Sequence, residues 1–232
     1  MKSLRYIFML FIAFMIVGCT PPERIKDNQS TDNTENIGGV DNDNNGSGAE
    51  NSSKPQTSAP YQVGDYFNES GKEGVVFYVD EDGNNGKIIS LLQSAETMQW
   101  TSDAVEQNRA YGATNSSEGL ENFAKIAAIA DWKSKYPAFK WCADLGDGWY
   151  LPAIEELKKF TINDTIHNAV NRTLAAKGAN KLCNRGEYEC NWSSTEGDIQ
   201  IGGVFCAWLV FLSNGGTYIK DSYGYVRAVS AF

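Results

Sequence analysis

Apolar and polar residues alternate along residues 61–232 in patterns that predict strands at both ends of this part and helices between them. Two runs rich in β-branched and aromatic residues, 75–79 and 87–92, predict a pair of strands. The acidic and glycine-rich stretch 80–86 between them has the composition of a hairpin turn. We therefore expect an antiparallel hairpin near the start of this part.

Helical spacing follows in the middle of the chain. Leu120, Phe123, Ala127 and Ala130 recur at helical intervals and predict a helix over 118–131. Three more helices are expected, with Pro152 in the first turn of the second and a Glu155–Lys159 pair on its surface. The predicted ranges of these three helices are 139–145, 152–160 and 165–177.

The last forty residues return to a strand pattern interrupted by glycines. We predict a hairpin turn over 214–216, where Asn-Gly-Gly can adopt positive φ. Strands, then helices, then strands again predict an α+β domain with antiparallel sheets, in which the first and last strands can pair. The predicted strands are 192–195, 204–212, 217–220 and 225–231.

The first nineteen residues form a different pattern. Lys2 and Arg5 precede an apolar run over 6–17, and Gly18 stands immediately before Cys19. This arrangement is typical of a secretory signal, and the run is shorter than the roughly 20 apolar residues of a spanning helix. Ile-Val-Gly-Cys resembles a bacterial lipobox, so we predict a signal peptide over 1–18 and a lipidated Cys19; an uncleaved anchor is the alternative.

Residues 19–60 are polar and of low complexity, and we predict a disordered tether. One stretch, 41–46, matches the first half of a calcium-binding loop, but Ser52 stands where such a loop needs a bidentate Glu. The tether joins the predicted lipid anchor to a single domain over 61–232. Lipidation places that domain in the cell envelope, and we expect an outer-membrane lipoprotein exposed at the surface.

Charge narrows the range of partners. The net charge of −9 argues against binding to nucleic acid and against binding to anionic lipid through a polybasic surface. We therefore expect membrane attachment through the lipid alone.

Four cysteines remain besides Cys19. An even number in an oxidising compartment predicts two disulfides, for which four cysteines allow three pairings. We favour Cys183–Cys190, which closes a short loop, together with Cys142–Cys206. A metal site is the alternative, but the chain has no C-x-x-C spacing and a single histidine, so we expect no metal and no cofactor.

Catalytic signals are weak. His167, the only histidine, has no G-x-S-x-G motif to accompany it and is expected on a helix surface. The carboxylate pairs Glu155–Glu156 and Asp144–Asp147 leave a carbohydrate-active enzyme as a minor alternative. Glu155 is better explained as a partner of Lys159 or of Arg227, and we predict that Arg227 is held by a carboxylate or by backbone carbonyls. No enzymatic activity is expected.

Three signatures occur in order along the domain. They are Gly-Trp-Tyr-Leu-Pro at 148–152 followed by Glu-Glu-Leu at 155–157, then Trp-Ser-Ser-Thr-Glu at 192–196, and then Tyr-Val-Arg-Ala-Val at 225–229. In this order and spacing they resemble the Lcl C-terminal domain family and, more loosely, FISUMP-type domains. The resemblance covers essentially all of 61–232.

That resemblance implies a C-type-lectin-like fold used for binding or adhesion outside cells. Some members of the family are reported to bind sulfated polysaccharides, and related lipoproteins are sometimes diversified by retroelements in their terminal strands and loops. The sequence contains neither the Glu-Pro-Asn or Gln-Pro-Asp tripeptide nor the Trp-Asn-Asp tripeptide of calcium-dependent sugar binding. Trp192 is followed by Ser193 and Ser194. A calcium-bridged sugar site is therefore not expected.

The expected binding surface is formed by polar and aromatic residues near the C-terminus, because loops on a rigid frame carry recognition. An adhesin that contacts a glycan or a protein is the first functional hypothesis, and a structural envelope protein that contacts another envelope protein is the second. Structural roles are expected for Trp149, Leu151, Pro152, Trp192, Ser194 and Arg227, and core positions for Trp208 and Val226. The ligand-binding candidates are Asp198, Gln200, Asn214, Thr217, Tyr218, Lys220, Asp221, Ser222 and Tyr223.

Overall fold

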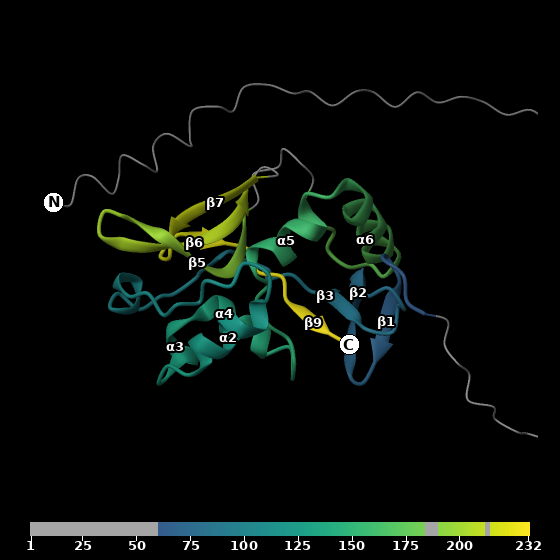
Figure 1. Cartoon of the computed structure of the whole chain (residues 1–232), viewed down its shortest axis with the longest axis horizontal. Helices are drawn as coiled ribbons and strands as arrows, with labels where there is room; N and C mark the ends of the chain where they lie inside the picture. Colours follow the sequence, from purple (N-terminus) through teal and green to yellow (C-terminus); the bar gives the residue numbers. More distant parts are fainter. Residues whose placement is uncertain (1–59, 184–189, 212–213) are drawn as a thin grey trace, which may run out of the picture. The chain divides into compact units, whose positions relative to one another are not determined.

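The computed structural model describes residues 60–183, 190–211 and 214–232, excluding the side chains of residues 211, 214 and 215. These residues belong to one compact unit. Its helices and antiparallel sheets confirm the predicted α+β class (Figure 1). The predicted signal peptide, Cys19 and the tether up to residue 59 lie outside the described residues. Within the described part, no helix has the length and apolar character needed to cross a membrane.

The first sheet, sheet A, joins the two ends of the domain. It has the order β1-β2-β3-β9 and is antiparallel throughout. Ser70 and Gly71 form the two-residue turn between β1 and β2, both with positive φ, and the predicted turn joins β2 to β3. The first and last strands belong to this one sheet but do not pair with each other, because β9 pairs with β3 and β1 pairs with β2. The bounds are β1 Tyr66–Glu69, β2 Lys72–Val79, β3 Gly86–Ser90 and β9 Val229–Ala231.

The helical middle begins with a 3-10 turn, η1. The inner face of α2 differs from the prediction, because Leu120 is exposed whereas Asn122 and Ile126 are buried. Pro152 lies before α5 rather than in its first turn, since Ala153 is the N-cap. The helices are η1 Glu106–Asn108, α2 Gly119–Ala127, α3 Trp132–Lys135, α4 Pro137–Ala143, α5 Ile154–Thr161 and α6 Asp164–Ala176.

The surface pair expected on α5 also differs. Glu155 forms its ion pair with Lys158, three residues on, at 2.7 Å. Lys159 lies over the ring of Tyr78, with its Nζ 4.2 Å from the ring centroid. Helical spacing alone allows both arrangements, and packing against β2 selects one of them.

Two further sheets contain the remaining strands. Sheet B pairs β4 (Met98–Gln99) with β8 (Tyr223–Gly224), and sheet C has the order β5-β6-β7. The predicted hairpin turn at 214–216 is displaced, because Asn214 already pairs with Phe211 and the connection is residues 212–213. The strands of sheet C are β5 Asn191–Ile201, β6 Val204–Phe211 and β7 Asn214–Ile219.

Two apolar clusters hold these elements together. One packs β2, β3 and α4 against the inner face of sheet C, and the other packs sheet A against α5 and α6. The expected core residues Trp149, Leu151, Trp192 and Val226 are buried, whereas Trp208 is half-buried beside α5. The indole of Trp192 donates to the Met98 carbonyl at 2.9 Å, which ties sheet C to sheet B.

Arg227 is buried, and its environment confirms the prediction for it. Its guanidinium donates to the carbonyl oxygens of Ser90 at 3.0 Å and Asn180 at 2.8 Å, and to Gln93 Oε1 at 3.1 Å. Among the other residues expected to be structural, Ser194 donates its amide to the Pro152 carbonyl at 2.7 Å. The second and third sequence signatures therefore hold the chain together at crossings between distant segments.

Candidate functional site

Strand β5 changes from buried to exposed along its length. All seven residues from Asn191 to Gly197 are buried, and all four from Asp198 to Ile201 are exposed. The register shifts between Glu196 and Gln200, but Gln200 and Ile201 still pair with Phe205 and Val204, so the exposed half remains part of the strand. The end of the β5–β6 hairpin, residues 198–204, therefore projects beyond the core at the left of Figure 1, and we call it the platform.

The two faces of this platform carry different side chains. Successive side chains of a strand point to opposite faces, and paired residues share a face. Ile199 and Ile201, exposed by 47% and 52%, lie on the outer face with Val204. Asp198 and Gln200 lie on the other face. The platform is therefore aliphatic on one side and polar on the other.

Two of the predicted ligand-binding residues, Asp198 and Gln200, belong to this platform, and the others lie on β7, on the segment after it and on β8. Asp198, Gln200, Tyr218 and Tyr223 are exposed, with 41% exposure for Tyr218 and 62% for Tyr223. Thr217, Asp221 and Ser222 are half-buried, and the backbone carbonyl of Asp221 accepts from Gln99 at 2.9 Å. The side chain of Asn214 lies outside the described residues. The structure thus places these candidates on sheet C, on the turn that leads to β8 and, for Tyr223, on β8 of sheet B.

Lys220 differs from the prediction that it contacts a ligand. Its side chain is completely buried, and its ammonium donates to Glu196 Oε1 at 2.5 Å and to the Arg109 carbonyl at 2.8 Å. It also lies 4.5 Å from the centroid of the Trp100 ring. Burial lowers the pKa of Lys220, against the opposing effect of Glu196. Lys220 is therefore part of the frame beneath the platform.

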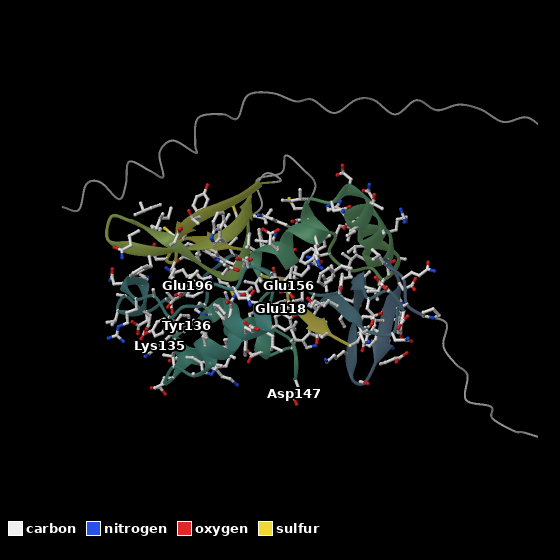
Figure 2. The ribbon with its side chains drawn as sticks, in the orientation of Figure 1. Glu118, Lys135, Tyr136, Asp147, Glu156 and Glu196 are labelled. Atoms are coloured by element: carbon white, nitrogen blue, oxygen red, sulfur yellow. The ribbon has the colours of Figure 1, made fainter. Side chains whose placement is uncertain are left out.

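Glu196 is the centre of that frame. Besides Lys220, it accepts the backbone amides of Tyr111 at 2.8 Å and Ala113 at 3.0 Å. Tyr111 continues the network through its hydroxyl, which donates to Glu106. The loop over 106–113 is thereby tied to the strands at the point where they leave the core, and Figure 2 shows Glu196 beneath sheet C.

Glu106 extends this network to the helices. It accepts from Lys135 Nζ at 3.1 Å and from the Tyr136 hydroxyl at 3.3 Å. Burial raises the pKa of Glu106, but the hydrogen bonds from Tyr111 and Lys135 lower it by more, and the net shift is downward. Burial raises the pKa of Tyr136, and the charge of Glu106 adds to the rise. Glu106 is thus a buried carboxylate that is held in its charged form.

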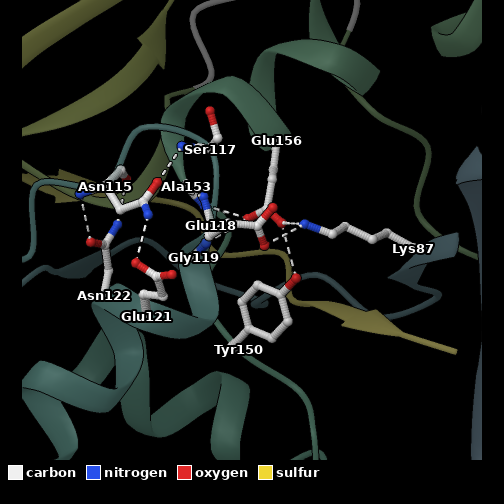
Figure 3. A network of polar contacts seen from close by, with 10 residues as sticks. All are labelled: Lys87, Asn115, Ser117, Glu118, Gly119, Glu121, Asn122, Tyr150, Ala153 and Glu156. Carbon is white, nitrogen blue, oxygen red and sulfur yellow. Dashed lines mark hydrogen bonds and ion pairs between the residues drawn. The ribbon is translucent and has the colours of Figure 1, made fainter.

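A second buried carboxylate, Glu156, lies at the start of α5 (Figure 3). It accepts from Lys87 Nζ at 2.5 Å, from the Tyr150 hydroxyl at 2.9 Å and from the backbone amides of Gly119 and Ala153 at 3.0 and 2.8 Å. Four donors satisfy this carboxylate, which joins sheet A to the first turns of α2 and α5. Glu156 is therefore part of the frame.

The packing at Gly119 shows how tightly this junction is built. A Cβ at Gly119 would lie 2.6 Å from the Leu151 carbonyl and 2.8 Å from Glu156 Oε2. Lys87 also pairs with the exposed Glu118 at 2.9 Å. A side chain at position 119 would therefore clash with both the backbone and the Glu156 carboxylate.

The other residues considered for chemistry have structural partners of their own. Glu155 is exposed and paired with Lys158, and Asp144 is paired with Lys140. His167 is buried, contrary to the predicted helix-surface position, and its Nε2 lies 3.0 Å from the Cys183 carbonyl oxygen. Among the described residues, no three His, Cys, Asp or Glu side chains are grouped as metal ligands.

The cysteines also depart from the favoured pairing. No disulfide is seen among the four described cysteines. Cys142 is buried in the same cluster as Ala207 and Leu209, so Cys206, which directly precedes Ala207 on β6, points to the opposite face of sheet C. The expected Cys142–Cys206 bond is therefore not what the structure shows. Cys190 packs against the cluster of Cys142, and residues 184–189, between Cys183 and Cys190, lie outside the described residues.

Sequence reasoning missed the two central features of the site. The alternation Asp198-Ile199-Gln200-Ile201 before Gly202-Gly203 was a signal for a two-faced strand ending in a tight turn, and both glycines have positive φ. No sequence signal pairs Glu196 with Lys220, which lie 24 residues apart. Comparison with protein-family models finds no matching family, and comparison with curated proteins finds no matching relative.

Proposed function

We propose that this chain is a lipid-anchored binding module of the cell envelope, and that its ligand contacts the projecting part of sheet C. The observation that carries the proposal is the change in β5 from seven buried residues to four exposed ones without loss of strand structure. A recognition surface needs exposed side chains in fixed positions. The buried Glu196–Lys220 pair holds β5 and the end of β7 in place next to the exposed part of sheet C.

The N-terminal sequence supports the envelope location. A secretory signal over 1–18, a lipidated Cys19 and a polar tether would deliver the domain to the outer membrane and hold it there. The tether would reach the domain at Tyr61, whose ring packs against Phe67 of β1 and against Phe232. This entry point belongs to sheet A, and Figure 1 draws β1 and sheet C on opposite sides of α5. The platform is thus separate from the attachment point.

The fold we propose is C-type-lectin-like, in the manner of the Lcl C-terminal domain family. The α+β architecture and the pairing of N-terminal with C-terminal strands are compatible with it. Disulfides belong to the same proposal, and Cys190 packs against the cluster that contains Cys142.

The ligand we propose is an extracellular glycan or protein, bound in an adhesive or recognition role. Exposed Tyr218 and Tyr223 offer aromatic faces, and Asp198 and Gln200 offer hydrogen-bonding groups. The same proposal assigns no catalytic role, because the donors around Glu156 and Glu196 leave both carboxylates saturated.

A structural envelope protein is the second candidate. Exposed Ile199 and Ile201 would suit a permanent contact with another envelope protein, since interfaces of that kind are more apolar than transient ones. Variation among close strains that is concentrated over 196–223 would favour recognition, and a uniform surface would favour the structural role.

The test is binding of the full chain, with Cys19→Ser to remove the predicted lipid attachment, to arrays of glycans and envelope proteins. Each array is run with calcium and with a chelator. We expect binding that survives the chelator and is lost in the double variant Tyr218→Ala/Tyr223→Ala. Tyr78→Ala is the matched control, because Tyr78 has 40% exposure and lies on sheet A. Binding that Tyr78→Ala abolishes and the double variant retains would contradict the proposed surface.

A further inference from the structure

The outer edge of β7 is open among the residues that the structure describes. Sheet C ends in β5 on one side and β7 on the other. The edge of β5 is covered by two other segments of the domain. Ser194 donates its amide to the Pro152 carbonyl and Glu196 donates its amide to the Ala113 carbonyl, each at 2.7 Å. Along the outer edge of β7, the one backbone bond to a described residue is from Ser222 to the Ile219 carbonyl.

The register identifies which backbone groups point outward. The Lys220 amide donates to the Phe205 carbonyl at 3.3 Å, and the ladder from Cys206–Ile219 to Phe211–Asn214 has no shift. In an antiparallel ladder hydrogen-bonded and non-bonded pairs alternate, so Thr217 lies in a non-bonded pair with Trp208. The Trp208 carbonyl accepts from Ser193 on the β5 side, which agrees with this alternation. The amide and carbonyl of Thr217 therefore face the open edge.

The edge of β7 lacks the usual protection against strand pairing. Natural edge strands are short, charged, bulged or interrupted by proline. The edge strand of sheet A, β1, is short and ends in Glu69 opposite Lys72. The six residues of β7, Asn-Gly-Gly-Thr-Tyr-Ile, contain no charge and no proline and pair without a bulge. β7 thus presents a regular ladder to an extended chain.

The side chains beside this edge favour a polypeptide ligand. Ile219 shares the outer face of sheet C with Val204 and Ile201, and Tyr218 lies on the other face. A strand added along β7 would place alternate side chains against these two faces. The net charge of −9 disfavours a second copy of this chain as that strand, because like charges repel at close range.

We infer that an extended, neutral or basic segment of another protein adds to β7 as the fourth strand of sheet C. This inference rests on the proposed function, because it names the partner class of the same binding surface. Backbone bonds to Thr217 supply the attachment, and the apolar outer face selects alternate apolar residues in the added strand.

The experiment uses the full chain with Cys19→Ser and a displayed library of extended peptides, in which apolar residues alternate with Ser, Lys or Arg. Amide hydrogen exchange is measured on the free protein and with a selected peptide. We expect slower exchange of the Thr217 amide by about tenfold or more, since strand pairing removes that amide from water. Binding that leaves the exchange of Thr217 unchanged would overturn the inference, because side-chain contact alone does not protect an edge amide.

A proline variant provides the second readout. Thr217→Pro removes the outward amide and keeps the bonds to β6, which come from its neighbours in the ladder. Thr217→Val keeps the amide and is the matched control. We expect a loss of peptide affinity of about tenfold or more in Thr217→Pro and retention in Thr217→Val. Equal affinity of the two variants would overturn the inference, and the exchange measurement on the unaltered chain remains decisive if Thr217→Pro does not fold.

Two outcomes separate this inference from the proposed function. If Tyr218→Ala/Tyr223→Ala abolishes binding on the arrays while Thr217→Pro retains it, the proposed surface binds through side chains and the strand-addition inference alone is wrong. If light scattering shows that the free chain self-associates and Thr217→Pro makes it monomeric, the edge pairs with a second copy and the inference of a different partner is overturned.

Discussion

The two halves of sheet C differ in how they are held. In the anchored half, Glu196 and Lys220 form a completely buried ion pair that also holds the loop over 106–113. In the projecting half, residues Asp198 to Ile201 are exposed, and Gln200 and Ile201 remain paired with β6. Strand β5 thus supports the fold in its buried half and forms a surface in its exposed half. A polar residue in the buried half has a structural role, and one in the exposed half is available to a ligand.

The largest effect is expected from breaking the anchored half. Lys220→Met leaves Glu196 buried without its cation, and loss of one partner of a buried pair typically costs about 3–5 kcal/mol. Urea unfolding measures this loss. Lys158→Ala, which breaks the exposed pair with Glu155, should cost less than about 1 kcal/mol.

A double variant sharpens that test. Glu196→Gln keeps an acceptor for the amides of Tyr111 and Ala113 but removes the charge, so adding it to Lys220→Met should recover part of the stability. A double variant less stable than Lys220→Met would show that the charge of Glu196 is satisfied by the amides alone.

The boundary between the halves is expected to be sensitive to volume. A Cβ at Gly197 would lie 3.0 Å from Thr217 Cγ2 and 3.4 Å from Cys206 Cβ. Gly197→Val should therefore cost about 1–3 kcal/mol through overpacking, measured by thermal unfolding. The neighbouring variant Asp198→Val, on the exposed side, should change stability by less than about 0.5 kcal/mol. Equal losses of stability in Gly197→Val and Asp198→Val would contradict a boundary between a packed and an exposed half at this point.

Acid pH should lower the stability of the anchored half through protonation of Glu106. The pKa of Glu106 is lower in the folded than in the unfolded chain, so its contribution to stability is present above the unfolded pKa of about 4.3 and is lost as pH falls through the folded pKa. Stability of the wild type should therefore fall below about pH 4.3 more steeply than that of Glu106→Gln. Parallel curves of unfolding free energy against pH would contradict this role.

The smallest effect on stability is expected at the exposed tyrosines of the proposed surface. Tyr218→Ala and Tyr223→Ala remove exposed rings, and each should change the free energy of unfolding by less than about 0.5 kcal/mol. Thermal melts of the two variants check this. A loss of more than about 1 kcal/mol at Tyr223 would mean that its ring supports sheet B rather than a ligand.

The sequence by itself determined the elements whose signals are local. The β2–β3 hairpin and the α6 helix could be predicted because strand and helix periodicity and turn composition are encoded over a few residues. The position of Arg227 against backbone carbonyls was also accessible, since a lone cation in an apolar strand requires acceptors.

Tertiary structure alone decided the roles of the polar residues. Lys220 and Tyr218 look equally suited to a surface in the sequence, yet one is completely buried and the other exposed. His167 was likewise expected at a surface and is buried against Cys183. The reason is physical: a charged side chain is stable in a core only beside a partner, and Lys220 acquires Glu196 and the Arg109 carbonyl only when β5, β7 and the loop over 106–113 meet.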